Sequence, residues 1–292
     1  MLSDEIVITG NRAIARSYAK INLSLDVLGK REDGYHNVEM IMQTVSLFDL
    51  IIVDKTSAGV RIATNRKFLP TNEKNIAFAA AMKFFEYTKI RGGCKILIQK
   101  NIPVSAGLAG GSGNGAAVLC VLDRLYNTGL TAEELSSIAV GLGADVPYCL
   151  TGGTALATGI GEILTPLPAL PDCNILMVKP HVSVSTPAIY SALDSETIMN
   201  HPDTAAITDA LSRNDLAAVA SNMENVMGAV TERMHPVVRG IRNKLVKNGA
   251  LGAVMSGSGP TVFGIFEDFK TAKRSHDSFA YQFKEVFLVN NK

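Results

Sequence analysis

A glycine-rich segment between a predicted strand and a predicted helix constrains the fold of this chain more than any other feature. Residues 94–99 predict a strand, and the small, apolar residues 116–125 repeat with helical period. Backbone N–H groups at a helix amino terminus, together with the helix dipole, favour a bound anion. The segment therefore predicts a strand, a loop and a helix in succession, in which the loop either binds phosphate or serves as a tight connection.

Two common phosphate-binding motifs do not describe this segment. A Walker A loop needs Gly-Lys-Ser/Thr, and no lysine lies between residues 103 and 122. Gly111, Gly113 and Ala116 satisfy the GxGxxA pattern of a dinucleotide-binding fold. That fold needs an acidic residue about 20 positions later, where this sequence instead predicts a second helix. NAD and nucleotide-sugar chemistry are therefore disfavoured.

A second glycine-rich element, residues 256–261, lies between two predicted strands. By itself it fits a hairpin turn as well as a ligand-binding loop. Two loops of small residues would let the backbone approach a diphosphate or triphosphate closely, because larger side chains would block that approach.

Composition limits the partners of the chain. With 292 residues, 47% hydrophobic and 19% charged, the chain is predicted to fold into one large domain or two ordinary ones. Its formal net charge of +1 gives no support for binding nucleic acid or an anionic membrane. The four cysteines lack disulfide or metal-ligand spacing, and the sequence shows neither an export signal nor an apolar run of about 20 residues. We therefore expect a cytoplasmic protein.

The order of predicted elements indicates an α+β fold. A proline-dense connector at residues 165–171 places the predicted boundary near residue 160, between domains 1–160 and 161–292. In the first domain, the predicted strands are 19–25, 37–54 and 94–99, and the predicted helices are 75–85, 116–125 and 131–141. In the second, the predicted strands are 174–179, 251–255, 261–266 and 286–289, and the predicted helices are 187–193, 205–230, 235–247 and one before the last strand.

Three motifs carry a resemblance to a known family. Residues 103–112, PVSAGLAGGS, resemble the PxxxGLxGGS ATP loop of the GHMP kinases, and residues 19–23 and 255–261 resemble the first and third motifs of that superfamily. The three occur in the same order as in the family. The resemblance implies a small-molecule kinase with a ribosomal-S5-like, ATP-binding amino-terminal domain and a ferredoxin-like, substrate-binding carboxy-terminal domain.

Four further strings, at residues 31–36, 40–44, 143–148 and 152–155, are similar to one subfamily of these kinases. That subfamily phosphorylates the 2-hydroxyl of a cytidylated methylerythritol, in the methylerythritol phosphate route to isoprenoid precursors. The resemblance implies the same small-molecule substrate here, with ATP and Mg²⁺, and a monomer or weak homodimer. A GHMP kinase of the homoserine or mevalonate type, or a GHMP-fold sensor without turnover, remains an alternative.

Two catalytic residues are implied by the resemblance. Asp145 would accept or orient the hydroxyl proton, and Lys20 would stabilise the carboxylate or the developing charge. From the residues alone, Asp145 before Val-Pro also fits a turn-capping acid, and Lys20 also fits a solvated strand lysine.

The implied ATP site places Asn75 and Lys100 near the adenine and makes Ser112 a phosphate or magnesium contact. The residues implied to wrap the phosphates are Pro103, Val104, Ser105, Ala106, Gly107, Leu108, Ala109, Gly110, Gly111, Ser112 and Gly113.

Three residues, at the end of this segment and at the start of the following helix, affect how rigid this part of the chain is. Ala109 replaces a glycine that is common in the family loop, and Gly113 and Gly115 add glycines to the start of the following helix. Each interior glycine costs ~0.5–1 kcal/mol relative to alanine. We therefore expect a looser helix start and weaker ATP binding.

Substrate recognition is likewise taken from the resemblance. The rings of Tyr35 and Tyr190 would sandwich the cytosine, and His36 would read the edge of the base. A surface-loop histidine is the alternative for His36. The other implied substrate positions are Asn22, Thr186, Gly257 and Ser258.

Overall fold

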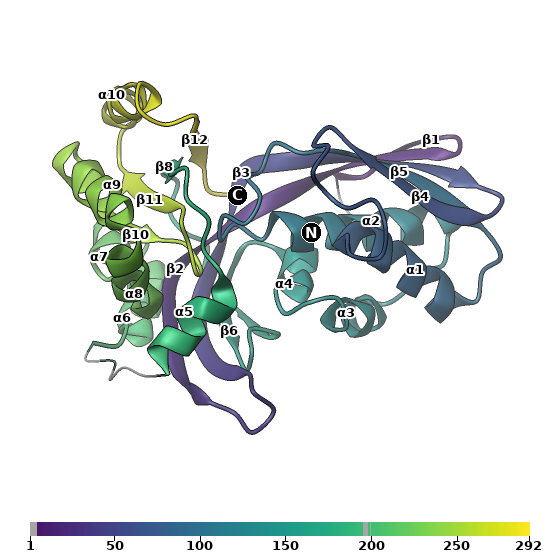
Figure 1. The fold of residues 1–292 in the computed structure, drawn as a ribbon, viewed down its shortest axis with the longest axis horizontal. Helices are drawn as coiled ribbons and strands as arrows, with labels where there is room; N and C mark the ends of the chain where they lie inside the picture. Colours follow the sequence, from purple (N-terminus) through teal and green to yellow (C-terminus); the bar gives the residue numbers. More distant parts are fainter. Residues whose placement is uncertain (1–4, 195–197, 199) are drawn as a thin grey trace. The chain divides into compact units, whose positions relative to one another are not determined.

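The computed structural model describes residues 5–194, 198 and 200–292 (Figure 1). Residues 1–4, on which the expectation of no export signal partly rests, lie outside the described residues. Contacts within the chain divide it into two units. Unit 1 comprises Met1–Ala19, Leu47–Val104 and Ala109–Gly152. Unit 2 comprises Lys20–Ser46, Ser105–Leu108 and Gly153–Lys292.

These units differ from the predicted division at residue 160. Two long strands, β2 (Arg12–Lys30) and β3 (His36–Thr56), contribute residues to both units. Within the glycine-rich segment, residues 105–108 belong to unit 2 and their neighbours on both sides belong to unit 1. Each unit is made of three separate stretches of the chain, so a single boundary in the sequence cannot divide one unit from the other. The assignment of ATP binding to one half and substrate binding to the other stays a prediction.

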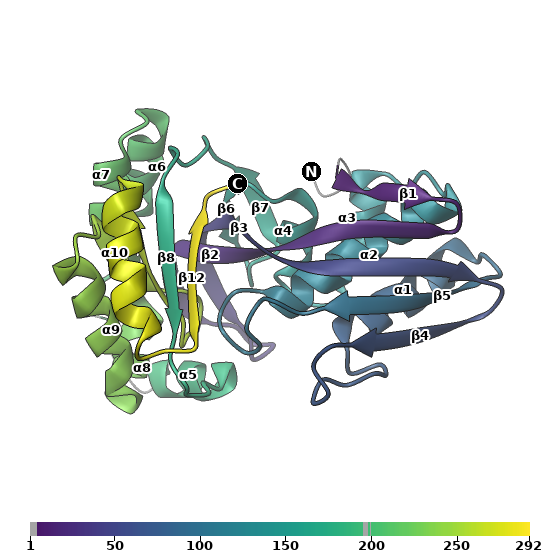
Figure 2. The ribbon, with the colours of Figure 1, turned by 90° about the horizontal axis from the view of Figure 1, so that it is seen from above.

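Unit 1 is a sheet with helices on one face. Besides its parts of β2 and β3, it contains β1 (Val7–Thr9), β4 (Gly59–Thr64), α1 (Ile76–Thr88), β5 (Gly93–Gln99), α2 (Gly110–Tyr126), α3 (Ala132–Val140) and α4 (Val146–Thr151). The strand order is β1-β2-β3-β5-β4, in which β4 and β5 are parallel and joined through α1. Figures 1 and 2 show α1, α2 and α3 on the same side of this sheet. The helix α2 packs against both α1 and α4.

Capping side chains explain where two helices of unit 1 begin. Asn75 precedes α1, and its side chain accepts a hydrogen bond from the backbone N–H of Ala77. Thr131 and Glu134 form the predicted capping box of α3, in which each side chain accepts from the backbone N–H of the other residue. The sequence pattern did not predict α4, because six residues are too few to show a helical period.

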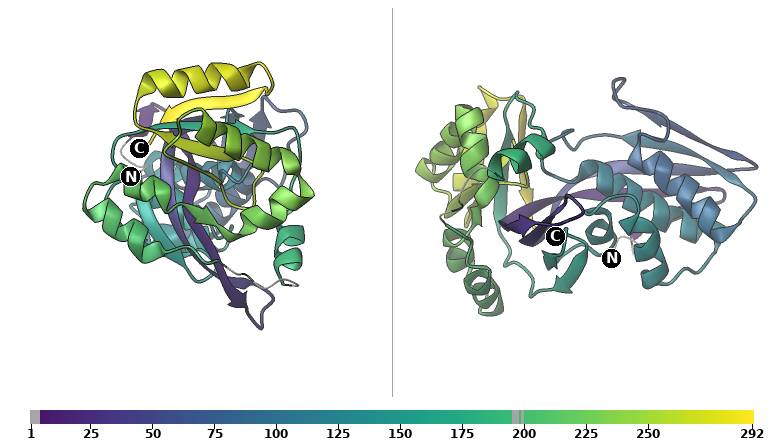
Figure 3. Two further views of the ribbon diagram at one scale, coloured as in Figure 1. Left: turned by 90° about the vertical axis from the view of Figure 1, so that its left-hand side faces the viewer. Right: turned by 60° about the horizontal axis from the view of Figure 1, so that its bottom comes forward.

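Unit 2 is built around an antiparallel four-stranded sheet with the order β10-β11-β8-β12. Besides parts of β2 and β3, unit 2 as a whole contains the strands β6 (Thr154–Thr158), β7 (Ile163–Pro166), β8 (Asn174–Lys179), β9 (Glu224–Asn225), β10 (Gly252–Met255), β11 (Val262–Phe266) and β12 (Glu285–Asn290). Its helices are α5 (Thr186–Leu193), α6 (Thr204–Ser212), α7 (Leu216–Ser221), α8 (Val226–Met234), α9 (Pro236–Lys247) and α10 (Phe269–Ala280). The helix α9 packs on β10 and β11, and α10 packs on β8 and β12. In Figure 3, α10 runs alongside β12, both in yellow.

One long predicted helix of unit 2 is wrong. The segment 205–230 contains α6, α7, the short strand β9 and the start of α8. Asp215 and Asn225 cause the breaks, since the side chain of each accepts a hydrogen bond from the backbone two or three residues later and begins a new helix. The mixture of helices and largely antiparallel strands confirms the predicted α+β class.

No helix among the described residues is long and apolar enough to span a membrane.

Candidate active site

Unit 2 brings residues of all three predicted motifs into direct contact. The backbone N–H of Lys20 on β2 donates to the carbonyl of Leu108 over 3.2 Å. The hydroxyl of Ser256 donates to the carbonyl of Gly107 over 2.8 Å. The approach is close because Gly107 has a φ of +74° and no side chain: a Cβ there would lie 2.0 Å from the Ser256 carbonyl oxygen. The first motif, the loop and the third motif therefore meet at Gly107 and Leu108.

Lys20 is not a solvated strand lysine. It is 4% exposed, and its ammonium group donates to the Asn22 side-chain oxygen over 2.8 Å. The Asn22 amide nitrogen in turn contacts the sulfur of Met40 on β3 at 3.1 Å. A buried ammonium group needs compensating partners. The structure therefore holds the Lys20 ammonium group in a fixed position on β2.

Asn225, which the sequence analysis did not single out, holds the third motif in place. Its buried side-chain nitrogen donates to the carbonyls of Met255 and Gly257 over 2.7 and 2.8 Å, and its oxygen accepts from Met227. One asparagine thus begins α8 and also fixes the loop that carries Ser256. In the sequence, Asn225 has the pattern of an ordinary helix cap, which gives no indication of its contacts with the third motif.

His36 lies at the start of β3 and is not a surface-loop histidine. It is 9% exposed, and its ring stacks on that of Tyr190 in α5, with centroids 4.5 Å apart and 18° between the planes. Its Nε2 lies 2.6 Å from Oδ1 of Asp194, whose other oxygen lies 2.6 Å from Nζ of Lys30. Hydrogen bonds from His36 and then Lys30 hold the pKa of Asp194 below its usual value.

Because the Asp194 carboxylate can only accept, His36 Nε2 must carry the proton of this hydrogen bond. In the neutral imidazole, Nδ1 is then an acceptor. Asp194 thereby sets the tautomer of His36, a role that sequence reasoning missed, because the two residues are far apart in the chain.

The predicted sandwich of Tyr35 and Tyr190 is only partly assembled. Tyr35 is 60% exposed, whereas one face of Tyr190 is covered by the His36 ring. A base placed between the two tyrosines would have to use the other face of Tyr190 or displace the imidazole. Two further predicted positions do meet: the hydroxyls of Thr186 and Ser258 lie 2.7 Å apart.

In unit 1, the helix α2 begins within the glycine-rich segment. Ala109 is its N-cap residue and has a left-handed backbone, with φ +52°. A non-glycine residue is disfavoured there, which explains why glycine is common at this position of the loop. The methyl side chain of Ala109 makes no capping hydrogen bond. Because the first N–H groups of a helix have no partner within the helix, the start of α2, near Ser112, is suited to an anion.

Gly113 and Gly115 have a packing role that changes the expectation of a loosened helix start. A Cβ at Gly113 would lie 2.8 Å from the hydroxyl of Ser17 and 3.2 Å from the carbonyl of Tyr18, both on β2. A Cβ at Gly115 would lie 2.7 Å from a methyl of Ile76 in α1. The glycines let α2 lie close to β2 and α1, so their intrinsic cost is offset by packing.

The replacement Gly113→Ser is therefore expected to destabilise the protein by about 1–3 kcal/mol, because an added side chain overpacks the contact with β2. Thermal unfolding measures the change. Gly111→Ala in the same helix is the control, since its Cβ would meet only a methyl of Ile76, at an ordinary 3.5 Å. A Tm for Gly113→Ser at or above that of the unsubstituted protein would contradict the packing role.

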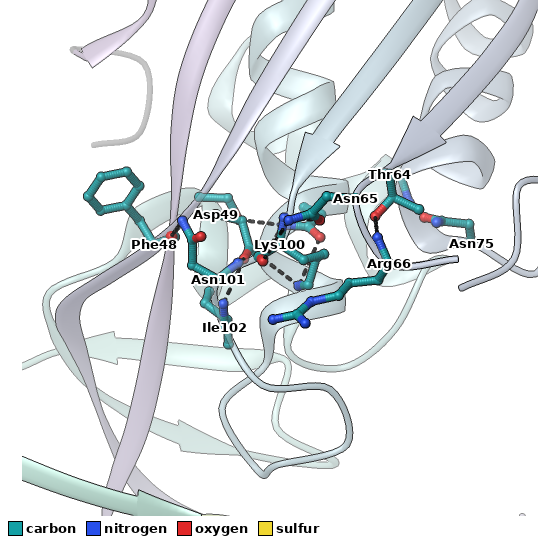
Figure 4. Close-up of polar contacts among 12 residues, drawn as sticks. Phe48, Asp49, Thr64, Asn65, Arg66, Asn75, Lys100, Asn101 and Ile102 are labelled. Carbon is teal, nitrogen blue, oxygen red and sulfur yellow. Dashed lines mark hydrogen bonds and ion pairs between the residues drawn. The ribbon is translucent and has the colours of Figure 1, made fainter. Parts of the chain in front are cut away.

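The two residues predicted near the adenine make structural contacts. The side chain of Asn75 caps α1 and donates to the carbonyl of Pro70 over 2.9 Å. Lys100, 4% exposed, forms an ion pair with Asp49 (Figure 4) and also donates to Asn114. Their contact with adenine stays a prediction. Asp49 was missed by sequence reasoning because an acidic residue within a strand has no local signal of burial.

Asp145 lies in unit 1, whereas Lys20 lies in unit 2. Asp145 is the N-cap residue of α4, with Val146 and Pro147 in the first turn. Within the described structure, its side chain makes no capping hydrogen bond to that helix. Asp145 therefore does not cap α4 through its side chain. Its catalytic role stays a prediction.

Comparisons with known proteins define the class first. The model of the GHMP kinase N-terminal domain matches residues 75–153, and that of the GHMP kinase C-terminal domain matches residues 207–285. The crystal structure of a homoserine kinase from Cytophaga hutchinsonii superposes with a TM-score of 0.81 at 19% identity, covering 98% of this chain and 97% of that one. Fold and motifs are those of the GHMP kinases.

Relatives with higher sequence identity indicate one family within the GHMP kinases. A 4-diphosphocytidyl-2-C-methyl-D-erythritol kinase from Alkaliphilus metalliredigens is 47% identical, over 94% of this chain and 95% of the relative. A crystal structure of 4-(cytidine 5'-diphospho)-2C-methyl-D-erythritol kinase has a TM-score of 0.83 at 33% identity, covering 95% of this chain and 98% of that one. The chain belongs to the family of 4-diphosphocytidyl-2-C-methyl-D-erythritol kinases. The resemblance found in the motifs, and the two-domain GHMP kinase fold it implied, are confirmed.

Proposed function

We propose that this protein transfers the γ-phosphoryl group of ATP to the 2-hydroxyl of 4-diphosphocytidyl-2-C-methyl-D-erythritol. The reaction belongs to the methylerythritol phosphate route to isoprenoid precursors. The observation that carries the proposal is the meeting of all three motifs in unit 2, where Lys20 and Ser256 hold Gly107 and Leu108. Membership of the family supports the choice of acceptor.

ATP is proposed to bind through residues 103–113, with its phosphates near the amino terminus of α2, where the Ala109 side chain makes no capping hydrogen bond. Its magnesium ion would be held by phosphate oxygens, water and the Ser112 hydroxyl, because a hydroxyl oxygen is a hard ligand of the type that Mg²⁺ prefers. No group of three His, Cys, Asp or Glu side chains forms a metal site within the described residues. Phosphate oxygens, water and one hydroxyl group form a donor set that fits a magnesium ion bound together with its nucleotide.

In the proposed reaction, phosphoryl transfer depends on position and charge more than on covalent help from the protein. Asp145 accepts or orients the proton of the acceptor hydroxyl, and the Lys20 ammonium group stabilises negative charge. The burial of Lys20 supports this assignment, because a charge surrounded by protein acts more strongly than a solvated one.

The cytidylated end of the acceptor is proposed to bind where His36, Tyr190 and Asp194 meet. The neutral form of His36 would offer Nδ1 as an acceptor to the exocyclic amino group of cytosine, which is a hydrogen-bond donor. The other proposed acceptor contacts are Asn22, Tyr35, Thr186, Gly257 and Ser258.

The replacement Asp194→Asn is expected to raise KM for the cytidylated acceptor about three- to tenfold, because the His36 tautomer is no longer imposed. KM for ATP should stay unchanged. Asp209→Asn is the control in the same unit. It breaks the exposed ion pair between Asp209 in α6 and Arg213, the residue that follows this helix. Equal KM values for the acceptor in both variants would exclude a role of Asp194 in recognition.

The proposed function is tested by ADP release from purified protein with ATP, Mg²⁺ and each of three acceptors. Release that depends strictly on 4-diphosphocytidyl-2-C-methyl-D-erythritol is expected. Release with mevalonate or homoserine instead would keep the kinase but exclude the cytosine site. Nucleotide binding without turnover on any acceptor would favour the sensor alternative.

The proposed setting is the cytoplasm, with the protein acting as a monomer or weak homodimer. Fractionation of cells and sedimentation of the purified protein test these two points separately.

A further inference from the structure

A buried ion pair lies beside the start of the glycine-rich segment in unit 1. We propose that Asp49 and Lys100 are positioning residues, which together hold both ends of this segment in the shape that binds ATP, and that Lys100 acts through Asp49 rather than by contact of its ammonium group with the nucleotide. The inference rests on the proposed binding of ATP by residues 103–113. Asp49 is 0% exposed and Lys100 is 4% exposed.

The first end of the segment is fixed by one oxygen of Asp49. Its Oδ1 accepts hydrogen bonds from the backbone N–H groups of Asn101 and Ile102 over 2.7 and 2.8 Å. These two residues immediately precede Pro103, where the segment begins. A carboxylate that accepts two backbone N–H bonds holds the chain more firmly than a neutral acceptor does. Figure 4 shows Asp49 facing Asn101 and Ile102.

The second end is fixed by the other oxygen of Asp49. Its Oδ2 pairs with the Lys100 ammonium group and accepts from the Asn114 side-chain nitrogen over 2.8 Å. Lys100 also donates to the Asn114 side-chain oxygen over 3.2 Å. Asn114 lies in α2, one turn after Gly110, and a Cβ at Gly110 would lie 3.0 Å from the Lys100 nitrogen. The pair therefore joins the residues before the segment to the helix that follows it.

The positive charge of Lys100 is compensated by Asp49, and its ammonium group also binds Asn114. Burial lowers the pKa of Lys100, and the neighbouring Asp49 opposes that shift. Its backbone is held as well: its N–H donates to the Asn65 side-chain oxygen over 2.9 Å, and its carbonyl accepts from the Asn65 nitrogen over 3.3 Å. An ammonium group neutralised by a buried carboxylate contributes little net attraction to a phosphate. Its role is therefore to hold Asp49 and Asn114 in place.

The test compares ATP and acceptor dissociation constants, by calorimetry, in the full-length protein and its variants. Asp49→Asn places an amide NH₂ where Oδ2 accepted from Lys100 and Asn114, so donors face donors. We expect the Kd for ATP to rise about 10- to 100-fold, and the Kd for the acceptor to change less than about twofold.

The double variant Asp49→Asn, Lys100→Met isolates the role of the lysine. It removes the uncompensated cation, while the oxygen of the amide introduced by Asp49→Asn can still accept from both backbone N–H groups. The double variant should recover most of the ATP affinity that Asp49→Asn loses.

Two controls separate positioning from general loss of stability. Asp54→Asn breaks an exposed pair with Arg12 in the same unit and should leave the Kd for ATP unchanged. Glu232→Gln removes a buried carboxylate that binds Arg239 and Arg242 in unit 2, and should lower Tm without a selective effect on ATP. If Asp49→Asn does not fold, Asn114→Ala takes its place. It removes the bonds of Asn114 to Asp49, Lys100 and Ser17 and leaves those between Asp49 and the backbone before the segment intact.

Unchanged ATP affinity in the Asp49 or Asn114 variants would overturn the inference. So would an equal loss of ATP and acceptor binding. If Lys100→Met weakens ATP binding equally in the presence and in the absence of the Asp49→Asn change, Lys100 contacts the nucleotide itself, and the positioning role is wrong. If the unsubstituted protein binds no ATP, both the proposed function and this inference are wrong. If it binds ATP and the variants bind ATP equally well, only this inference is wrong.

Discussion

Replacing Asp145 by asparagine is expected to lower kcat by about 10²- to 10⁴-fold, the usual contribution of a positioned acid or base. Binding of ATP and of the acceptor should change little, because asparagine keeps the shape of the side chain and loses only its charge. The carboxylate does not cap α4 in the described structure, so the replacement should also leave that helix intact. A loss confined to kcat is the signature of an interaction made only in the transition state.

Single-turnover rates and calorimetric Kd values for both ligands measure these effects. Glu86→Gln on the exposed side of α1 removes one carboxylate from the same unit and is the matched control. Full turnover by Asp145→Asn, or weakened binding that accounts for the whole loss, would exclude a catalytic role.

The replacement Gly107→Ala should abolish most ATP binding, with a rise in Kd of about 100-fold or more. Two physical causes act together. A side chain at φ +74° costs about 1–2 kcal/mol, and its Cβ would lie 2.0 Å from the Ser256 carbonyl oxygen. No alanine can stay there unless the loop and the third motif move apart, which also breaks the hydrogen bond from the Ser256 hydroxyl.

Equilibrium ATP binding and thermal unfolding measure the result. Gly228→Ala in α8 of the same unit is the control, because an added Cβ there meets no described heavy atom within 4 Å. It should keep ATP affinity and leave Tm unchanged or slightly raised, since alanine favours a helix over glycine. Wild-type ATP affinity in Gly107→Ala would show that the approach of the two loops is not needed for binding.

Much of the fold could be predicted because its signals are local. The capping box of Thr131 and Glu134, and strand β8, have the residues that the sequence predicted. The segment 205–230 was mistaken for one helix because Asp215 and Asn225 begin new helices by hydrogen bonds that a periodic pattern does not reveal. The single boundary at residue 160 differs from the structure because β2 and β3 contribute to both units, and no composition shift marks such strands.

The candidate site divides in the same way. Motif spacing indicated Lys20, the glycine-rich loop and the third motif, and the structure brings these three together in unit 2. Sequence reasoning missed Asp49, Asp194 and Asn225 because each acts on a residue at least 30 positions away. An ordinary polar residue becomes informative only when its distant partner is known.

The sequence alone determined the α+β class, the family and the order of the motifs, because these depend on residue types and spacings that are readable along the chain. Only the tertiary structure decided what the glycines do: Gly107 admits the backbone of Ser256, and Gly113 admits that of Tyr18. It also decided that Lys20 is buried rather than solvated. The physical reason is that burial and close approach arise from residues distant in sequence, whose contacts exist only once the chain has folded.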